Sequence, residues 1–423
     1  MDTLIIGGGA AGAAAAIAAA EKGERVTVLD RNRKPLKKLG VSGNGRGNVM
    51  NRDPAAYFGD DSFARAVFDV VPPSALRAFW EGLGVPLADD GEGRVYPAAY
   101  LASVAVDAMM LRMAELGVRH IQNTRATAIL PRTGGFAVEA EETLYQPDAR
   151  KANGKVKKGE AVSRRPAFYS ARRVIVAAGG AAAPALGTDG SAYALLTALG
   201  HTLIPPRPAL CALVTETGPI RGLEGQRIRA GLRLLSPSGK ELAQSRGEAL
   251  FAGDGVSGIA AMELGRYAEK GCTLEMDLRE GVLGAVQANA AGWLGERVRR
   301  HGERPLRTLL TGAATQPLAE ALFHSAGLND LSRPLSLESH GEALARQIEA
   351  FPLPVLGTRG WDAAQVTAGG LETREFDERT MESKRIPGLY VAGEMLNVDG
   401  PCGGYNLMFA VASGLLAGRG SQE

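Results

Sequence analysis

A glycine-rich turn near the amino end constrains the fold of this chain more than any other feature. Thr3–Ile6 is a short apolar run, a Gly-x-Gly-x-x-Gly motif occupies residues 7–12, and an alanine-rich stretch continues over Ala10–Lys22. A second apolar run, Arg25–Leu29, ends at Asp30. This order predicts a strand, a tight turn, a helix and a second parallel strand, which together form the βαβ unit of dinucleotide-binding folds.

Each glycine of this motif has a separate physical task. Gly7 permits the tight turn, Gly9 lets the backbone approach a pyrophosphate, and Gly12 lets the helix pack closely on the strand. The helix start offers unpaired N–H groups and the positive end of its dipole to the phosphates. Asp30 lies eighteen residues beyond Gly12, where an acid can accept hydrogen bonds from an adenosine ribose.

The carboxyl end of the chain favours FAD over NAD. Residues 386–394 form an apolar run that ends in Gly393-Glu394, and Gly400–Asn406 is rich in glycine and precedes another helical pattern. Such a strand can bring its terminal acid to the ribityl and pyrophosphate groups, and such a helix start can place N–H groups beside the flavin N1/O2 edge. An enzyme that binds only NAD has no need for this return of the chain.

A third glycine-rich segment, Ser42–Asn48, follows soon after Asp30. It has three glycines in seven residues together with Arg46, so we expect a loop folded over phosphate or over the dimethylbenzene side of the flavin. Lys37 and Lys38 precede it. They could neutralise pyrophosphate charge, and exposed, solvated charge is an equally good interpretation.

Composition and charge exclude several other classes of protein. The formal net charge of +2 gives no general reason for binding nucleic acid or a membrane surface. The three cysteines are far apart without a CxxC pair, and the five histidines complete no zinc spacing, so we expect neither a disulfide framework nor a metal. No basic segment precedes the apolar start, which argues against a signal peptide. These features favour a cytoplasmic protein.

The order of the patterns predicts an α/β protein with insertions. We expect a two-part Rossmann-like FAD-binding domain over residues 1–200 and 366–423, with an antiparallel β-barrel insert over 201–281, a small helical domain over 282–348 and a return through the barrel over 349–365. Among its elements we expect strands at Leu210–Thr215, Gln226–Leu235, Thr273–Asp277, Asp362–Thr367 and Gly388–Ala392, and helices at Val282–His301, Pro305–Leu310, Gln316–Ala326, Glu342–Glu349 and Asn406–Leu416.

The stretch from Glu142 to Pro166 differs in composition from its surroundings. It is basic, polar and almost free of large apolar groups. A patch for nucleic acid is one interpretation, but aromatic residues are not interleaved with the charges, so a solvated, poorly ordered hairpin or loop is the better one.

Four motifs, at residues 7–12, 42–48, 177–180 and 388–406, resemble a known family. The chain is similar along nearly its whole length to the BaiN-like bacterial flavoproteins, which include aminoacetone oxidases and bile-acid dehydro-reductases. The resemblance implies an FAD domain, a β-barrel insert and a helical insert. Two departures matter: Gly47 stands where relatives commonly have cysteine, which removes any role for a thiol in that loop, and Asp30 replaces the commoner glutamate.

The motifs and the resemblance together identify candidate site residues. The catalytic residue is unknown, with Tyr405, Asn406 and Arg46 as candidates; for Tyr405 stacking is favoured over proton donation. Cys402 is interpreted as a small buried thiol and His201 as structural. The residues expected to bind FAD are Gly7, Gly9, Ala10, Ala11, Gly12, Asp30, Arg31, Lys38, Ser42, Gly45, Asn48, Ala128, Ala178, Gly179, Gly393, Glu394, Gly403, Gly404, Tyr405 and Asn406.

Three functions fit these patterns, because the flavin would carry the chemistry while the protein positions it. The first is reduction of an enone or similar unsaturated small molecule with NAD(P)H as a transient electron donor. The second is oxidation of a small amine with release of hydrogen peroxide. The third is a non-catalytic or nucleic-acid-associated flavin protein, favoured only by the basic stretch. We expect a small-molecule substrate, and neither a nucleic acid, a membrane nor a metal as partner.

Overall fold

The computed structural model describes residues 1–53, 55–150, 156–157, 159–286, 288–301, 304–334 and 341–420. The chain divides into two compact units. The first unit comprises Met1–Arg207 and Val366–Glu423, and the second comprises Pro208–Gln365. Each is described by itself.

A five-stranded parallel sheet is the centre of the first unit, and its order is β22-β13-β1-β2-β7. β1 (Thr3–Ile6) lies between β2 (Val26–Leu29) and β13 (Arg173–Val176), pairing with both in parallel. β7 (Arg119–Ile121) extends one edge and β22 (Leu389–Val391) the other. The carboxyl-terminal part of the chain therefore adds a strand to the sheet that the amino end begins.

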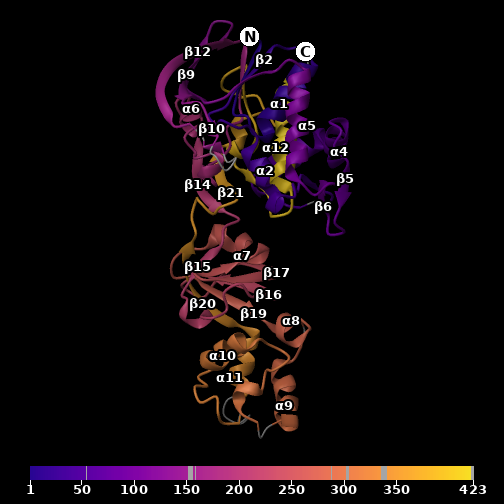
Figure 1. Cartoon of the computed structure of the whole chain (residues 1–423), viewed down its shortest axis with the longest axis vertical. Coiled ribbons are helices and arrows are strands. Elements are labelled where there is room, and N and C mark those ends of the chain that lie inside the picture. The colour runs from indigo at the N-terminus through magenta and orange to yellow at the C-terminus, as the bar shows by residue number, and fades with distance from the viewer. Residues whose placement is uncertain are drawn as a thin grey trace. The chain divides into compact units, whose positions relative to one another are not determined.

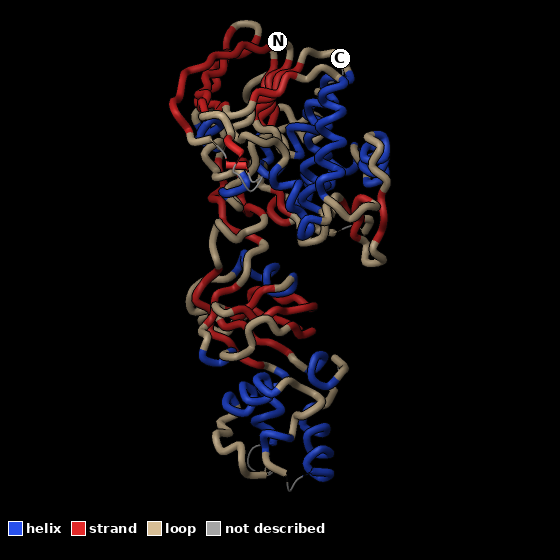
Figure 2. The backbone as a smooth tube through the Cα atoms, in the orientation of Figure 1, coloured by secondary structure: helices blue, strands red, loops and turns tan. Residues whose placement is uncertain are grey.

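Two helices from opposite ends of the chain pack tightly on each other beside this sheet (Figures 1 and 2). They are α1 (Ala10–Glu21) and α12 (Tyr405–Arg419). A Cβ atom on Gly414 would lie 2.3 Å from the carbonyl oxygen of Ala11, and one on Gly418 would lie 2.4 Å from that of Ala15. The alanines and glycines thus allow a backbone approach that larger side chains would prevent.

The basic stretch that follows Glu142 is better ordered than its composition suggested. β8 (Thr124–Arg132), β9 (Gly135–Tyr145) and β12 (Ala161–Ala171) form an antiparallel sheet, and the β9–β12 hairpin continues as far as the Tyr145–Ala161 pair. Arg164 and Arg165 form ion pairs with Glu141 and Glu142 on the neighbouring strand. The sequence left a hairpin or a loop open, and the structure shows the hairpin; the side chains of β12 are mostly exposed, as expected for a solvated segment, and cross-strand ion pairs and the backbone ladder stabilise it. Residues 151–155 and 158 lie outside the described part.

Short helices and strands complete the first unit, with β14 running across its boundary. They are α2 (Lys37–Val41), α3 (Asp61–Val70), α4 (Pro73–Gly82), α5 (Ala102–Glu115), α6 (Tyr193–Thr197), β3 (Met50–Asn51), β4 (Phe58–Gly59), β5 (Leu87–Asp89), β6 (Arg94–Pro97), β10 (Ala149–Arg150), β11 (Val156–Lys157), β14 (Leu203–Ala209), β21 (Val366–Leu371) and β23 (Val398–Asp399). The strand expected at Asp362–Thr367 begins four residues later, at Val366, because Gly360 and the turn after it precede the ladder.

A closed six-stranded antiparallel barrel forms the second unit together with a group of helices. The strand order is β15-β18-β17-β16-β19-β20. The bounds are β15 (Leu213–Thr215), β16 (Arg227–Leu235), β17 (Glu241–Ala252), β18 (Gly255–Ser257), β19 (Thr273–Asp277) and β20 (Phe351–Thr358). β20 pairs with β19 and with β15, so this late strand closes the barrel. The predicted fold class, a Rossmann-like domain with an antiparallel barrel, is confirmed.

The helices of the second unit share one hydrophobic core with the barrel. The continuous helix expected over Val282–His301 was wrong: one helix ends at Leu283, Gly284 follows with φ 80°, and the next helix begins at Ala290. A left-handed glycine ends helices because it needs no Cβ. The segment expected as a helix at Pro305–Leu310 is only a 3₁₀ turn over Leu306–Thr308. The helices are α7 (Ile259–Leu264), α8 (Arg279–Leu283), α9 (Ala290–His301), α10 (Gln316–Ser325) and α11 (Glu342–Glu349).

Throughout the described ranges, every helix is too short or too polar to span a lipid bilayer.

Candidate functional site

The glycine turn between β1 and α1 combines two tight contacts with one open position. A Cβ on Gly7 would lie 2.4 Å from the Ala177 carbonyl oxygen, and one on Gly12 would lie 1.9 Å from the Gly7 carbonyl oxygen. At Gly9, by contrast, no atom of the described residues comes within 4 Å of the Cβ position. Gly9 is also the N-cap of α1 and has no side chain to cap the first N–H groups. The turn thus offers an open, hydrogen-bond-donating surface for an anion.

Asp30 is buried at the end of β2, close to this turn. Its Oδ1 accepts hydrogen bonds from the Asn32 backbone N–H at 2.8 Å and from the Asn32 side-chain amide at 3.0 Å. Burial raises the pKa of the Asp30 carboxyl above its ordinary value, because a charged group is less stable away from water. These hydrogen bonds fix the orientation of the carboxylate at the end of β2.

Asp30→Ala is expected to weaken FAD binding by about tenfold to a hundredfold, since hydrogen bonds to a carboxylate would be lost. The dissociation constant is measured by titrating the apoprotein with FAD, and circular dichroism checks that the unit remains folded. Asp30→Glu serves as the matched variant and should retain most of the affinity. An unchanged affinity in Asp30→Ala would remove this residue from the site.

Lys38 and Glu394 link the two ends of the chain. Lys38 Nζ lies 2.6 Å from Glu394 Oε2, and Glu394 Oε1 accepts a hydrogen bond of 2.8 Å from the Thr367 backbone N–H. Gly393, with φ 74°, brings its Cβ position to 2.9 Å from Ala11 Cβ. The segment after β22 therefore lies directly beside the start of α1.

The Ser42–Asn48 loop contacts the glycines that precede α12. A Cβ on Gly404 would lie 2.7 Å from Asn48 Oδ1, and Asn51 Nδ2 donates a hydrogen bond of 2.9 Å to the Gly403 carbonyl oxygen. Asn48 Oδ1 is buried and has no hydrogen-bond partner among the described residues. A buried acceptor without a donor is unfavourable, so a bound group with an N–H or O–H suits this position.

These observations fit FAD. The open Gly9 position suits a pyrophosphate, the buried carboxylate suits a ribose, and the unpartnered Asn48 oxygen lies beside the uncapped start of α12, whose N-cap is Gly404. The three segments belong to one compact unit. The sequence analysis expects motifs near both ends of the chain to bind one FAD, and these segments come from both ends.

The three catalytic candidates have different surroundings. Arg46 is exposed, and its guanidinium lies 5.1 Å from the centroid of the Tyr96 ring. Tyr405 is buried, and its hydroxyl donates a hydrogen bond of 3.0 Å to the Asp53 carbonyl oxygen; burial raises its pKa. The Asn406 amide closes its own loop, accepting from the Gly400 N–H and donating to the Gly400 carbonyl oxygen, each at 2.8 Å. Of the three candidates, Arg46 alone has an exposed side chain.

The other residues expected to bind FAD all belong to the first unit. Arg31 forms an ion pair of 2.5 Å with Asp189, and Ser42 Oγ donates to the Leu39 carbonyl oxygen. Ala178 and Gly179 follow β13, where a Cβ on Gly179 would lie 2.6 Å from Thr188. Ala128 instead lies in the β8–β9–β12 sheet, opposite Glu139. Ala10 and Ala11 begin α1, and Gly45 lies within the Ser42–Asn48 loop.

Sequence spacing missed a buried polar group formed by His201, Glu375 and Ser383. His201 Nδ1 lies 2.7 Å from Glu375 Oε2, and His201 Nε2 lies 3.0 Å from Ser383 Oγ. The order of side chains resembles that of a serine hydrolase, but the His201 side chain is fully buried. Ser383 Oγ also accepts the backbone N–H groups of residues 385 and 386, so this group stabilises the fold rather than attacking a substrate.

Thr367 was also missed as a site residue. Its Oγ1 accepts the N–H groups of Ala181 and Ala182, and its own N–H binds Glu394. A signal was present in the sequence, because Thr367 belongs to the segment Val-Thr-Ala-Gly-Gly at residues 366–370, which also resembles the BaiN-like family.

Comparison with known proteins agrees with this geometry. A family model described as the HI0933-like protein Rossmann domain matches residues 1–420. The chain belongs to this family. It is 32% identical to a 3-dehydro-bile acid delta(4,6)-reductase of Clostridium scindens, over 99% of this chain and 98% of that protein. It is 27% identical to a ribosomal RNA dihydrouridine synthase of Escherichia coli, over 97% and 96% of the two chains.

Among solved structures, an open conformation of a flavocytochrome c3 fumarate reductase matches with a TM-score of 0.48 and 15% identity, covering 99% of this chain and 77% of that one. The resemblance to BaiN-like flavoproteins is confirmed by the family match and the bile-acid reductase relative. This member of the HI0933-like family is an FAD-dependent oxidoreductase.

Proposed function

We propose that the protein reduces a carbon–carbon double bond conjugated with a carbonyl group in a small molecule, with NAD(P)H as the electron donor. The observation that carries this proposal is the convergence of the Gly9 turn, the Asn48 loop and the start of α12 in one unit. When bound, FAD supplies the hydride-transfer chemistry. The protein's part is to bind it, orient it and polarise the substrate.

The FAD-binding residues divide between the two ends of the cofactor. The Gly9 backbone and the first N–H groups of α1 would bind the pyrophosphate, and Asp30 would accept the ribose hydroxyls. Lys38 and Glu394 would border the ribityl and pyrophosphate groups. The uncapped start of α12 at Gly404 would direct N–H groups and a positive dipole end to the flavin ring, where they favour negative charge on the reduced ring.

The names of two relatives support this reaction class. A 3-dehydro-bile acid delta(4,6)-reductase and a ribosomal RNA dihydrouridine synthase both act, by their names, at a double bond conjugated with a carbonyl. Such a bond accepts hydride more readily when its carbonyl oxygen receives a hydrogen bond. A uracil ring within RNA is thus a second candidate substrate, favoured by the dihydrouridine synthases. The small molecule is the stronger candidate because Glu141 and Glu142 partly neutralise the basic hairpin.

Arg46 would donate that hydrogen bond to the substrate carbonyl. Its guanidinium is exposed and is positioned by the Tyr96 ring. We expect Arg46→Ala to lower kcat/KM by about tenfold with FAD retained, because one charge-assisted hydrogen bond is lost in the transition state, and Arg46→Lys to recover part of it. Steady-state kinetics with an enone substrate measures the effect. Arg65→Ala, which removes an exposed arginine on α3, is the control and should match the wild type.

Anaerobic mixing tests the proposed function directly. NADH or NADPH added to the FAD-loaded protein should bleach the flavin absorbance, and a conjugated enone should restore it. Bleaching only by an amine, with hydrogen peroxide formed in air, would instead show an amine oxidase and overturn the proposal. Reoxidation by uridine-containing RNA but by no small enone would move the assignment to the second candidate.

A further inference from the structure

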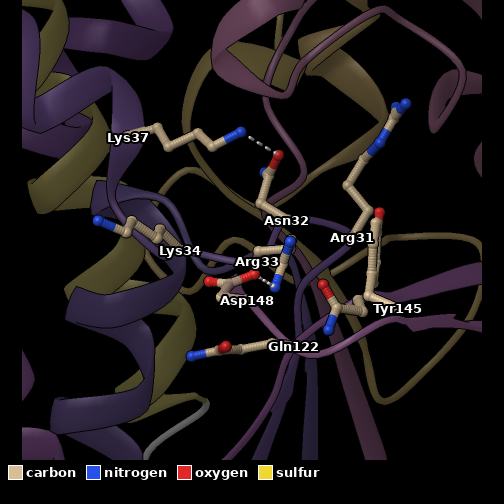
Figure 3. Close-up of a pocket in the computed structure, with 9 residues that line it drawn as sticks. Arg31, Asn32, Arg33, Lys34, Lys37, Gln122, Tyr145 and Asp148 are labelled. Carbon is tan, nitrogen blue, oxygen red and sulfur yellow. Dashed lines mark hydrogen bonds and ion pairs between the residues drawn. The ribbon is translucent and has the colours of Figure 1, made fainter. Parts of the chain in front are cut away.

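The proposed FAD site has an adenosine end and a flavin end, and a substrate would meet the flavin end. A cavity of about 460 Å³ belongs to the adenosine end, since Arg31 and Asn32 line it and Asn32 also bonds to Asp30 (Figure 3). The Ser42–Asn48 loop is assigned to the flavin end, because the unpartnered Asn48 oxygen lies beside the start of α12. A surface for the substrate is therefore expected around this loop.

Three exposed apolar residues border the Ser42–Asn48 loop. They are Val41, Tyr100 and Leu101, which expose 51%, 39% and 55% of their surface. Val41 directly precedes the loop. Leu101 precedes Ala102, whose Cα would lie only 2.8 Å from a Cβ on Gly47, so the start of α5 packs against the loop. Exposed apolar side chains that gather at one place are typical of binding surfaces.

Tyr100 ends a row of planar groups that begins at Arg46. The Arg46 guanidinium lies 5.1 Å from the centroid of the Tyr96 ring, and the Tyr96 and Tyr100 centroids are 5.3 Å apart, with the ring planes inclined by 34°. Tyr96 is buried, whereas Arg46 and Tyr100 are exposed. The buried ring thus holds a cation and an aromatic ring at the surface, where both can contact a ligand.

Tyr100 and Leu101 both break local preferences of the backbone. Tyr100 has φ 52°, in the left-handed region where glycine or asparagine is more stable than a bulky residue. Leu101 is the N-cap of α5, where an apolar side chain cannot accept a hydrogen bond from the first N–H groups. Residues that oppose the local fold and also expose apolar surface are expected at functional sites. A bound ligand would explain both.

We propose that Val41, Tyr100 and Leu101 form a platform that binds the apolar ring of a planar conjugated ketone, and that Tyr100 selects for this ring. The choice of a conjugated ketone rests on the proposed function, in which Arg46 donates a hydrogen bond to the carbonyl oxygen. The ring of such a ketone would lie against Tyr100.

The composition of the platform disfavours an RNA strand. Val41, Tyr100 and Leu101 are uncharged, and Arg46 adds one cation beside them. RNA brings a phosphate with each nucleotide, and its affinity depends on several cationic side chains that neutralise this charge. A compact molecule with one polar end and an apolar ring is the better match.

Binding of a matched pair of ketones tests the platform without turnover. Benzylideneacetone and ethylideneacetone share one conjugated ketone, and the first carries a phenyl ring where the second has a methyl group. Calorimetric titration of the FAD-loaded protein, with NAD(P)H left out, should show about tenfold tighter binding of benzylideneacetone, the size of one good aromatic contact. Arg46→Ala should weaken the binding of both ketones alike, because it acts on their shared carbonyl group.

Tyr100→Asn separates ligand binding from folding. Asparagine tolerates the left-handed backbone, so the variant should unfold at a temperature no lower than the wild type. Its affinity for benzylideneacetone should fall about tenfold, while its affinity for ethylideneacetone stays unchanged. Tyr100→Phe should retain the preference for the ring. Phe168→Asn, which removes an exposed aromatic ring on β12, is the control and should bind both ketones as the wild type does.

Three results would overturn the proposal. Unchanged binding of benzylideneacetone to Tyr100→Asn would show that the ring lies elsewhere. A clearly lower unfolding temperature of this variant would show that the tyrosine supports the fold. Tyr100-dependent binding of a uridine-containing oligonucleotide that is tighter than that of benzylideneacetone would assign the platform to a nucleobase. Tyr100-dependent ketone binding by a protein whose flavin NAD(P)H does not bleach would instead support the platform and contradict only the proposed function.

Discussion

Replacing Gly9 with valine is expected to yield a folded protein that purifies without its yellow cofactor. The Gly9 backbone has φ −80°, which any residue adopts, and its Cβ position meets no atom of the described residues within 4 Å. A valine side chain therefore has room in the protein alone. It would extend into the space where the pyrophosphate approaches the backbone, and this close approach is the reason for glycine at that point.

The ratio of flavin absorbance to protein absorbance measures the loss, and far-ultraviolet circular dichroism establishes that the fold is retained. Gly82→Val is the matched control: Gly82 also has free space around its Cβ position, but it lies at the end of α4. That variant should keep its FAD. A substitution at the neighbouring Gly12 would not test FAD binding alone. A Cβ there would lie 1.9 Å from the Gly7 carbonyl oxygen and would disturb the turn itself. A yellow Gly9→Val protein would contradict the pyrophosphate assignment.

The elements that the sequence predicted best are those set by local signals. The βαβ unit at the amino end rests on apolar runs separated by a glycine motif, and the observed strands and helix follow it closely. β19 begins and ends as predicted, at Thr273–Asp277. The convergence of the Gly7–Gly12 turn with Gly393 was also predictable, because both motifs are recognisable from their residues alone.

Individual strands with mixed or contradictory signals were not predicted, although the chain was expected to return through the barrel over 349–365. β20 alternates buried Phe351, Leu353 and Val355 with two exposed prolines, and proline is unusual in strands. β17 carries many polar residues in its first half, where most side chains are exposed. In both strands the barrel ladder outweighs the local preference.

Interactions between residues distant in sequence were also beyond prediction. The basic hairpin residues looked like solvated charge, yet Tyr145 and Asp148 fold against Arg33, more than a hundred residues earlier. No spacing rule relates such positions.

The second large effect is expected from a substitution in the buried group of His201, Glu375 and Ser383, which should lower the stability of the fold. We expect His201→Ala to lower the free energy of unfolding of the FAD-loaded protein by about 3 kcal/mol. The variant removes a ring that stacks on Phe376 at 4.7 Å and leaves Glu375 and Ser383 without their shared partner. Urea unfolding measures the change. His324→Ala, an exposed histidine on α10, is the control and should stay within about 0.5 kcal/mol of the wild type.

The group of His201, Glu375 and Ser383 also makes the stability of the folded protein depend on acid pH. This pH dependence distinguishes the loss of hydrogen bonds in His201→Ala from the loss of packing alone. Burial raises the pKa of the Glu375 carboxyl, but hydrogen bonds from Thr202, His201 and Arg385 outweigh it and hold the pKa at about 2. A depressed pKa stabilises the folded state above the ordinary value near 4.5, and this stabilisation is lost as the pH falls from there towards 2. His201→Ala should flatten this part of the stability curve because one of the bonds is gone. A variant as acid-sensitive as the wild type would show that the histidine only fills space.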